Sequence, residues 1–219
     1  MLSVEISGQP MALLAPKAAF LPDSRTLLVA DAHIGKAVSF RRLGVPVPRG
    51  TTSQTLAALS TLIDGLAVRR IVFLGDFLHG PASHAASTMR TLLEWRLKHA
   101  STTLTLVRGN HDDRAGDPPA ALGFEVVGEP WHLGGLALCH YPQVVDGSYV
   151  LAGHLHPCVT VLGRARERLR LPCFWFGARG AVLPAFGAFT GMQAVSPAAG
   201  DRLYAVAGDA VMALPGTGG

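Results

Sequence analysis

The sequence predicts an α/β protein, a sandwich built around β-sheets and not a purely doubly wound sheet, on three observations. Five short apolar runs have the length and the β-prone composition of buried strands. Helix-like segments separate the first three runs, which gives the order strand, helix, strand, helix, strand. From Glu125 onward the pattern changes to shorter strands divided by Gly and Pro turns, with little helix expected.

Each predicted strand leads into an acidic, amide or imidazole side chain. The runs are Thr26–His33 (TLLVADAH), Ile71–His79 (IVFLGDFLH), Leu104–Asp112 (LTLVRGNHD), Leu136–His140 (LALCH) and Tyr149–His156 (YVLAGHLH). Strands of β-α-β units run parallel, so their carboxyl ends gather at one edge of a sheet. We therefore expect the five polar ends to converge on one site.

Two helices are predicted between the first three strands. Thr52 or Ser53 would cap the first, whose apolar residues fall at helical spacing: Leu56, Leu59, Ile63 and Leu66. Ser83 or Ser87 would open the second, which Ala100-Ser101 would end. We expect core positions for its apolar residues, which are Leu92, Leu93, Trp95 and Leu97.

The length of 219 residues suits one domain, residues 1–219, with a short flexible tail from about 215 to 219. With 49% apolar and 16% charged residues, the chain is not of the disordered class. No apolar run approaches the ~18 residues of a transmembrane helix, and the N-terminus lacks a basic secretion signal. Three cysteines without a CxxC motif, Cys139, Cys158 and Cys173, predict free buried thiols and a cytoplasmic protein.

The chain has a formal net charge of +4 and a pI near 9.3, and arginine supplies most of the positive charge. A basic excess fits a polyanionic partner such as nucleic acid. A general preference of the genome for arginine over lysine explains the same composition, and the sequence leaves both explanations open.

The five strand ends offer oxygen and nitrogen donors without a cluster of thiols: Asp31, His33, Asp76, Asn110, His111, Asp112, His140, His154 and His156. Such a set suits divalent Mn, Fe or Zn. There are more donors than one tetrahedral ion needs, whereas two ions that share a bridging carboxylate would use most of them. Paired ions ~3.5–4 Å apart recur in enzymes that attack phosphate esters.

The spacing of the donor residues in two of the motifs also predicts that their side chains point to one place. In an extended segment, residues two apart point the same way, so Asp31 and His33, and likewise His154 and His156, would face one place. Gly75, Gly109 and Gly153 precede key donors, where a glycine allows a sharp turn or a close approach.

In this order, the motifs D-x-H, G-D, G-N-H-D, a lone His and G-H-x-H resemble the calcineurin-like metallophosphoesterases. They span residues 31–156, and G-N-H-D together with G-H-x-H is highly specific. The stretches AHIGKAVSFRRLGVPVPRGTT and LPAFGAFTG (Leu183–Gly191) resemble the ligase-associated (PdeM-type) branch, described as DNA endonucleases of the DNA-damage response. The resemblance therefore extends from about Leu27 to Gly191.

The resemblance implies a four-layer α-β-β-α sandwich of two mixed sheets, with metals at the carboxyl-terminal edge of the strands. It implies two divalent ions, Mn most of all, with Fe or Zn as alternatives. One ion would be bound by Asp31, His33 and His156, and the other by Asn110, His140 and His154. Asp76 would bridge both.

For catalysis, the family pattern implies that a hydroxide held between the ions attacks phosphorus. His111 would act as the general acid for the departing alkoxide. Asp112 would either keep His111 protonated and oriented or cap a loop, and the sequence does not decide between these roles.

Substrate contacts are predicted outside the metal motifs. Arg41, Arg42 and Arg49 follow the first motif, and His79 would lie at the site mouth. Four arginines alternate in RARERLRL and would share one strand face, either as a phosphate track or as a solvated edge: Arg164, Arg166, Arg168 and Arg170. Three other histidines are expected to be bystanders: His84, His99 and His132.

The leading hypothesis is a Mn-dependent DNA endonuclease of DNA repair, functionally associated with a DNA ligase and a helicase. The first alternative is a small-molecule phosphoesterase acting on a cyclic nucleotide, a dinucleoside polyphosphate or a phosphomonoester, because the fold's core builds the catalyst and its loops choose the substrate. A non-catalytic scaffold is the remaining alternative, and the full set of motif residues disfavours it.

Overall fold

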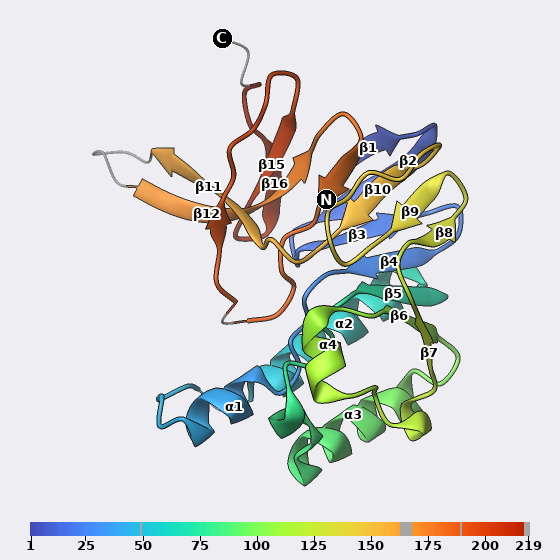
Figure 1. The fold of residues 1–219 in the computed structure, drawn as a ribbon, viewed down its shortest axis with the longest axis vertical. Coiled ribbons are helices and arrows are strands. Elements are labelled where there is room, and N and C mark those ends of the chain that lie inside the picture. The colour runs from blue at the N-terminus through green and yellow to red at the C-terminus, as the bar shows by residue number, and fades with distance from the viewer. Residues whose placement is uncertain (49, 163–167, 189, 217–219) are drawn as a thin grey trace.

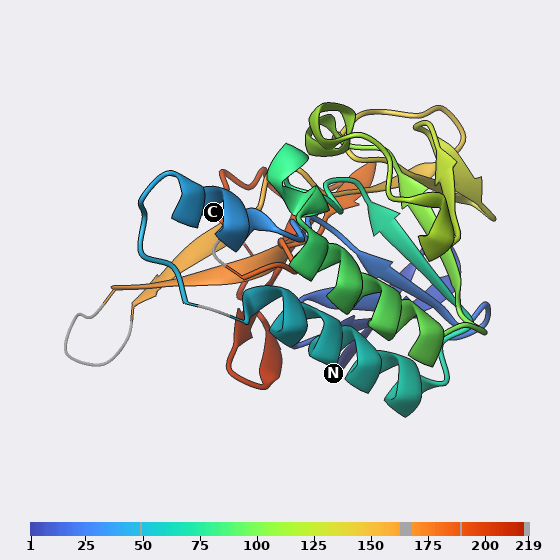
Figure 2. The same cartoon turned by 90° about the horizontal axis from the view of Figure 1, so that it is seen from below.

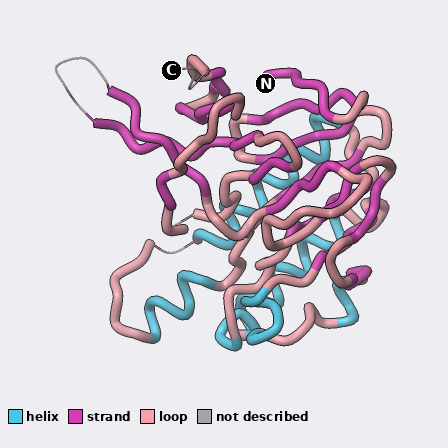
Figure 3. The backbone as a smooth tube through the Cα atoms, turned by 45° about the horizontal axis from the view of Figure 1, so that its top comes forward, coloured by secondary structure: helices cyan, strands magenta, loops and turns pink. Residues whose placement is uncertain are grey.

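A computed structural model describes residues 1–48, 50–162, 168–188 and 190–216 (Figure 1). Two β-sheets face each other, and helices cover the outer side of one of them. Figure 3 shows the separation plainly, with strands on one side of the molecule and helices on the other. The predicted α/β class is confirmed, and so is the order of strands and helices in the first half of the chain.

The first sheet has seven strands among the described residues, in the order β1-β2-β3-β4-β5-β6-β7. Its first three pairings are antiparallel, and β4 to β7 are parallel. The strands are β1 Leu2–Ile6, β2 Gln9–Leu14, β3 Ala18–Leu21, β4 Thr26–Val29, β5 Arg70–Leu74, β6 Thr103–Val107 and β7 Phe124–Val127. Because β4, β5 and β6 are parallel, the first three polar segments leave the same edge.

The helices connect strands of this first sheet. They are α1 Lys36–Arg42, α2 Thr51–Leu66, α3 Ala86–Lys98 and α4 Asn110–Ala115, with 3₁₀ turns η1 Pro81–His84 and η2 Ala120–Leu122. Figure 2 shows α2 and α3 side by side over the sheet. Their apolar faces, with Leu59 and Leu92 fully buried, pack with Phe73 of β5 in one core. None of the described helices is long and apolar enough to cross a bilayer.

The predicted helix starts were wrong. Helix α2 follows Gly50, whose left-handed φ of 86° turns the chain into the helix, so Thr52 and Ser53 lie inside it. Helix α3 begins after Ala85 without a side-chain cap. The Ser83 hydroxyl instead lies in η1, where it donates to the Ile34 carbonyl.

The apolar stripe of α3 is narrower than predicted. Leu92 is 0% exposed and Trp95 is buried, but Leu93 is 37% and Leu97 77% exposed. Successive helical residues are rotated by about 100°, so Leu97 points well away from the face that Leu92 and Trp95 share. Leu93 and Leu97 are therefore not core residues.

The second sheet has nine strands in the described part of the chain, along the path β14-β11-β12-β13-β10-β9-β8, with β15 paired to β12 and β16 paired to β15. The strands are β8 Trp131–Leu133, β9 Leu136–Leu138, β10 Tyr149–Ala152, β11 Pro157–Leu162, β12 Arg168–Phe176, β13 Gly180–Val182, β14 Gln193–Ala194, β15 Arg202–Ala207 and β16 Ala210–Ala213. The parallel pair β9 and β10 delivers the last two polar segments. The β11–β12 hairpin extends from the body of the molecule (Figure 1).

An apolar layer joins the two mixed sheets. Leu28 and Leu74 of the first sheet share a buried cluster with Leu138, Leu151 and Phe174 of the second. The predicted fold with two mixed sheets is confirmed, and the described helices all lie between β4 and β7, before the strands of the second sheet begin. Connections between its strands contain turns and loops in the described ranges, as the scarcity of helical patterns after Glu125 predicted.

All three cysteines are free and buried, as predicted. Burial raises the pKa of Cys139 to about 11 and that of Cys173 to about 12. Their thiols therefore stay protonated at neutral pH and pack as small apolar groups.

Candidate metal centre

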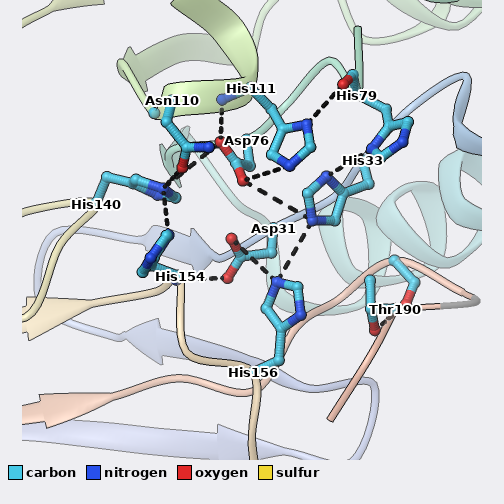
Figure 4. Close-up of polar contacts among 12 residues, drawn as sticks. Asp31, His33, Asp76, His79, Asn110, His111, His140, His154, His156 and Thr190 are labelled. Carbon is cyan, nitrogen blue, oxygen red and sulfur yellow. Dashed lines mark hydrogen bonds and ion pairs between the residues drawn. The ribbon is translucent and has the colours of Figure 1, made fainter. Parts of the chain in front are cut away.

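The five polar segments meet at one end of the sandwich, as the sequence predicted (Figure 4). Three of them follow β4, β5 and β6 of the first sheet, and two follow β9 and β10 of the second. Contacts cross between the sheets: the His154 N–H donates to Asp31 Oδ2 at 2.9 Å, and His140 Nε2 lies 3.5 Å from Asp76 Oδ1. The site thus lies where the facing edges of two sheets come together.

One group of donor atoms combines Asp31, His33 and His156, all within 4.8 Å of one another. The Nε2 atoms of His33 and His156 are 3.4 Å apart, and His156 Nε2 is 3.5 Å from Asp31 Oδ1. Two imidazoles and a carboxylate at this spacing suit a divalent transition metal.

A second group combines Asp76, His140 and His154 within the same limit. His154 Nδ1 lies 3.1 Å from His140 Nε2. Asn110 Oδ1 lies 3.0 Å from the same His140 nitrogen and adds a neutral oxygen donor.

Asp76 lies between the two groups. Its Oδ2 is 3.9 Å from His33 Nε2 in the first group, and its Oδ1 is 3.5 Å from His140 Nε2 in the second. Burial raises the pKa of Asp76, and the neighbouring Asp31 carboxylate acts in the same direction. Bound cations would offset both effects, since opposite charge favours the ionised carboxylate.

Backbone carbonyls orient two of the imidazoles. His140 Nδ1–H donates to Leu74 O, and His156 Nδ1–H donates to Gly191 O, each at 3.0 Å. With its proton on Nδ1, each ring turns a free Nε2 lone pair to the centre, the arrangement typical of metal-binding histidines.

A buried carboxylate oxygen that accepts no hydrogen bond within the described part of the chain also indicates a cation. Asp31 Oδ1 is inaccessible and accepts no hydrogen bond from the described residues. Such a charged oxygen is costly unless a cation or donor compensates it. The donor atoms, their orientation and this oxygen fit a pair of divalent ions.

The backbone at five of the donor residues is left-handed, with positive φ at Asp31, His33, Asp76, His154 and His156. This conformation costs of order 1–2 kcal/mol for a residue other than glycine. The expected extended geometry of the two i, i+2 pairs was therefore wrong. Asp31 and His33 still share one donor group, but His154 and His156 belong to different groups.

All three predicted glycines permit close approach. A Cβ on Gly109 would lie 2.5 Å from Asp76 Oδ1, and the other two glycines are similarly crowded. A Cβ on Gly75, which has φ of 79°, would lie 2.1 Å from His140 Nδ1. A Cβ on Gly153 would lie 2.7 Å from Asp31 Oδ2. None of these positions has room for a side chain while the donors keep their places.

A third group of rings lies beside the two donor groups. His79 stacks on His111 with ring centroids 4.7 Å apart, and both rings pack edge-on against His33. His111 Nδ1–H donates to the His79 carbonyl at 2.7 Å, while His111 Nε2 is 3.9 Å from Asp76 Oδ2. Burial lowers the pKa of His79 to about 4, so this ring is neutral at pH 7.

The chain is similar to known proteins both in sequence and in structure. The family model for calcineurin-like phosphoesterases matches residues 24–131. The structure is similar to the crystal structure of Pseudomonas putida nuclease MPE, with a TM-score of 0.87. The two sequences are 44% identical, and the match covers 97% of this chain and 99% of the nuclease chain. The chain belongs to the calcineurin-like phosphoesterases. It is therefore a metal-dependent phosphoesterase, and the resemblance seen in its motifs is confirmed.

Other similarities to this phosphoesterase are weaker. Yfce, a phosphoesterase from E. coli, is 16% identical with a TM-score of 0.42, covering 84% of this chain and 88% of that one. The protein of unknown function AQ665 from Aquifex aeolicus is 17% identical with a TM-score of 0.39, covering 60% and 78%. No curated protein sequence matches the chain.

Asp112 of the phosphoesterase does not contact the His111 ring. Its Oδ1 and Oδ2 accept hydrogen bonds from the N–H groups of Leu78 and Gly109, at 2.9 and 3.0 Å. Burial raises the pKa of Asp112 to about 6, although these bonds act in the opposite direction. The geometry favours the loop-capping role over a direct contact with His111.

Four of the predicted substrate arginines are among the described residues, and these four lie outside the metal centre. Arg41 and Arg42 are exposed at the end of α1, and Arg41 donates to Pro48 O at 3.2 Å. Arg168 and Arg170 lie on β12 of the protruding hairpin, two residues apart. Three more lie outside the described residues: Arg49, Arg164 and Arg166. The expected bystanders take no part in the donor groups: His84, His99 and His132.

Two contributors were missed in the sequence. Glu129 accepts hydrogen bonds from the backbone N–H groups of His140 and Tyr141, which holds the His140 loop in place. The Tyr141 ring packs against His140 and His154, with centroids 4.8 and 4.5 Å away. No spacing rule points to Glu129, whereas the position of Tyr141 directly after His140 is a signal in the sequence.

Proposed function

We propose that this phosphoesterase is a dinuclear, Mn-dependent endonuclease that cleaves the phosphodiester bonds of DNA. The observation behind the proposal is the pair of donor groups with Asp76 between them. Similarity over almost the full length to a protein named as a nuclease supports nucleic acid as the substrate. The basic excess of the chain is consistent with a polyanion.

In this proposal, one ion is held by Asp31, His33 and His156, and the other by Asn110, His140 and His154. Asp76 is shared. Bound divalent ions would acidify water and neutralise negative charge on the phosphate oxygens. The protein's part is to fix the donors, through the carbonyl hydrogen bonds of His140 and His156 and through backbone held in left-handed conformations.

His111 is the proposed general acid. Its Nδ1 proton is engaged by the His79 carbonyl, so its Nε2 is the nitrogen free to give a proton to the leaving oxygen. The carboxylate of Asp76 lies 3.9 Å from that nitrogen. His79 packs on the other side of the ring and limits its rotation.

We extend the proposal to a role in DNA repair in the cytoplasm, in functional association with a DNA ligase and a helicase. Its support is the likeness of two long stretches to the ligase-associated branch. A small-molecule phosphoesterase remains the alternative, because the metal donors are common to both.

Nicking of covalently closed plasmid tests the proposal. Metal-stripped protein is assayed with and without added Mn²⁺, and Asp76→Asn is the matched variant. We expect nicking that requires both Mn²⁺ and Asp76. If the protein instead hydrolyses a small phosphodiester with Mn²⁺ and leaves the plasmid closed, the nuclease proposal is wrong and a small-molecule substrate replaces it.

A further inference from the structure

A polar cavity of about 170 Å³ adjoins the metal centre on the side of His156. Its volume is several times the ~30 Å³ that a water molecule occupies in the liquid. The described lining contains no acidic side chain and comprises Lys17, His156, Pro157, Pro172, Ala185, Gly187, Ala188, Thr190 and Met192. The cavity is thus a cationic space that a donor residue of the metal centre also faces.

Lys17 is the charged residue in this lining. It lies in the turn between β2 and β3, and its Nζ donates to the Gly187 carbonyl at 3.4 Å. Among the described residues no carboxylate pairs with it, whereas Lys98 on α3 lies 3.9 Å from Asp64. Burial lowers the pKa of Lys17 to about 8, so the side chain is a partly desolvated cation at neutral pH.

Backbone groups of Gly187 and Gly191 fix the cavity relative to the metal centre. The Gly187 N–H donates to the Asp31 carbonyl at 3.1 Å, and the Gly191 carbonyl accepts from His156 Nδ1. Thr190 also donates its hydroxyl to Gly187 O at 3.3 Å, beside His156 in Figure 4. Lys17 therefore contacts a residue, Gly187, whose backbone N–H also binds the carbonyl of the metal donor Asp31.

A second cation lies next to two other lining residues. Arg170 on β12 donates to the carbonyl of Met192, a lining residue, at 2.6 Å. Arg170 is two residues from Pro172, another lining residue, and side chains two apart on a strand share a face. Two positive charges at the cavity, without a carboxylate in the described lining, favour a bound anion.

We propose that Lys17 binds the phosphate of the nucleic-acid strand that neighbours the phosphate being cleaved. This inference rests on the proposed nuclease function and assigns one subsite to it. A strand lying across the metal centre towards His156 would place a backbone phosphate in the cavity, where Lys17 neutralises it. The contact is the same before and during the reaction, so it strengthens substrate binding without changing the chemical step.

The test compares Lys17→Gln with Lys98→Gln, which removes the same charge from an exposed site on α3. The substrates are a DNA oligonucleotide and bis-p-nitrophenyl phosphate, a small diester with no second phosphate. For Lys17→Gln on DNA we expect KM to rise about tenfold with kcat within twofold, and the slope of log affinity against log salt to fall by about 0.7. Lys17→Arg should restore KM, and the small diester should be cleaved at the wild-type rate.

Three outcomes would overturn the subsite. Equal losses on both substrates would show that Lys17 only tethers the segment around Gly187. Equal KM increases in Lys17→Gln and Lys98→Gln would reveal an effect of net charge alone, and unchanged KM would leave Lys17 without a role. If wild-type protein cleaves the small diester but not DNA, the nuclease proposal fails with it, which separates that failure from the others.

Discussion

Main-chain carbonyl groups fix the ring orientation of three histidines in this phosphoesterase. His111, His140 and His156 each donate an Nδ1 proton to a carbonyl of a different segment. Each Nε2 is then directed by the position of that segment, so the rings are preorganised without large side-chain networks. Five donor residues have a left-handed backbone, and the free energy of this unfavourable conformation is the cost of the arrangement.

Replacing His111 with Ala should separate catalysis from metal binding. We expect turnover of DNA to fall by about 10²–10⁴-fold, the usual contribution of a general acid. Metal content should stay unchanged, because the backbone N–H of residue 111 still donates to Asp76 Oδ1. Steady-state kinetics and metal analysis of the same sample measure both.

The leaving group provides the control for His111→Ala. A p-nitrophenolate departs without much need for a proton, so bis-p-nitrophenyl phosphate should show a much smaller loss. Wild-type turnover of DNA by this variant would remove His111 from the mechanism. Loss of metal together with activity would assign it a role in binding instead.

At the scale of elements, the loops that follow the parallel strands carry and position the metal donors, and the strands hold these loops in place. The loops after β4 and β5 bond to each other, with His33 N–H donating to Asp76 O at 2.8 Å and Ile34 N–H to Phe77 O at 2.7 Å. These bonds continue the parallel pairing past the strand ends. Helices α2 and α3 pack against the outer face of the first sheet, and this packing keeps β4 and β5 in register.

Truncation of two leucines tests the orientation of α3. Leu92→Ala should lower the free energy of unfolding by about 2–5 kcal/mol, because the side chain is fully buried. Leu97→Ala should change it by less than about 0.5 kcal/mol, because Leu97 is 77% exposed. Urea unfolding monitored by circular dichroism gives both values, and comparable losses would contradict the described face.

At the scale of the molecule, the metal centre joins the two sheets. Asp31, Asp76 and Asn110 come from the first sheet's loops, and His140 and His154 from the second's. Two buried carboxylates and several imidazoles in one place destabilise the metal-free protein, as the raised pKa of Asp76 indicates. Ions that bind the folded chain should therefore stabilise the whole sandwich.

Thermal unfolding with and without Mn²⁺ measures this coupling. At free Mn²⁺ about 100 times the Kd, binding adds about 2.7 kcal/mol, which corresponds to roughly 5–10 °C in Tm. Asp76→Asn should abolish most of the shift, and without metal it should unfold at or above the wild-type temperature because a buried charge is gone. An equal Mn²⁺ shift in the variant would place the ions elsewhere.

The sequence by itself determined the chemistry of this protein and half of its architecture. Short apolar runs that end in Asp, Asn or His identified β4, β5, β6, β9 and β10, and the nature of the donors indicated divalent metal. These signals are local, because a strand is recognised from the pattern of its own residues and a metal donor from the atoms of its own side chain. The hairpins formed by β1, β2 and β3 were not predicted, because their pairing depends on the sheet that they extend.

Only the tertiary structure decided how the donors are shared and which other groups complete the site. His154 and His156 diverge because left-handed backbone, fixed by contacts with other segments, replaces the extended geometry that spacing alone suggested. Asp112 caps a loop through the N–H groups of Leu78 and Gly109, and Lys17 faces a cavity beside His156, so the structure also decided these two roles. Several of these contacts join residues far apart in the chain, such as Asp31 and His154, and no local pattern encodes them.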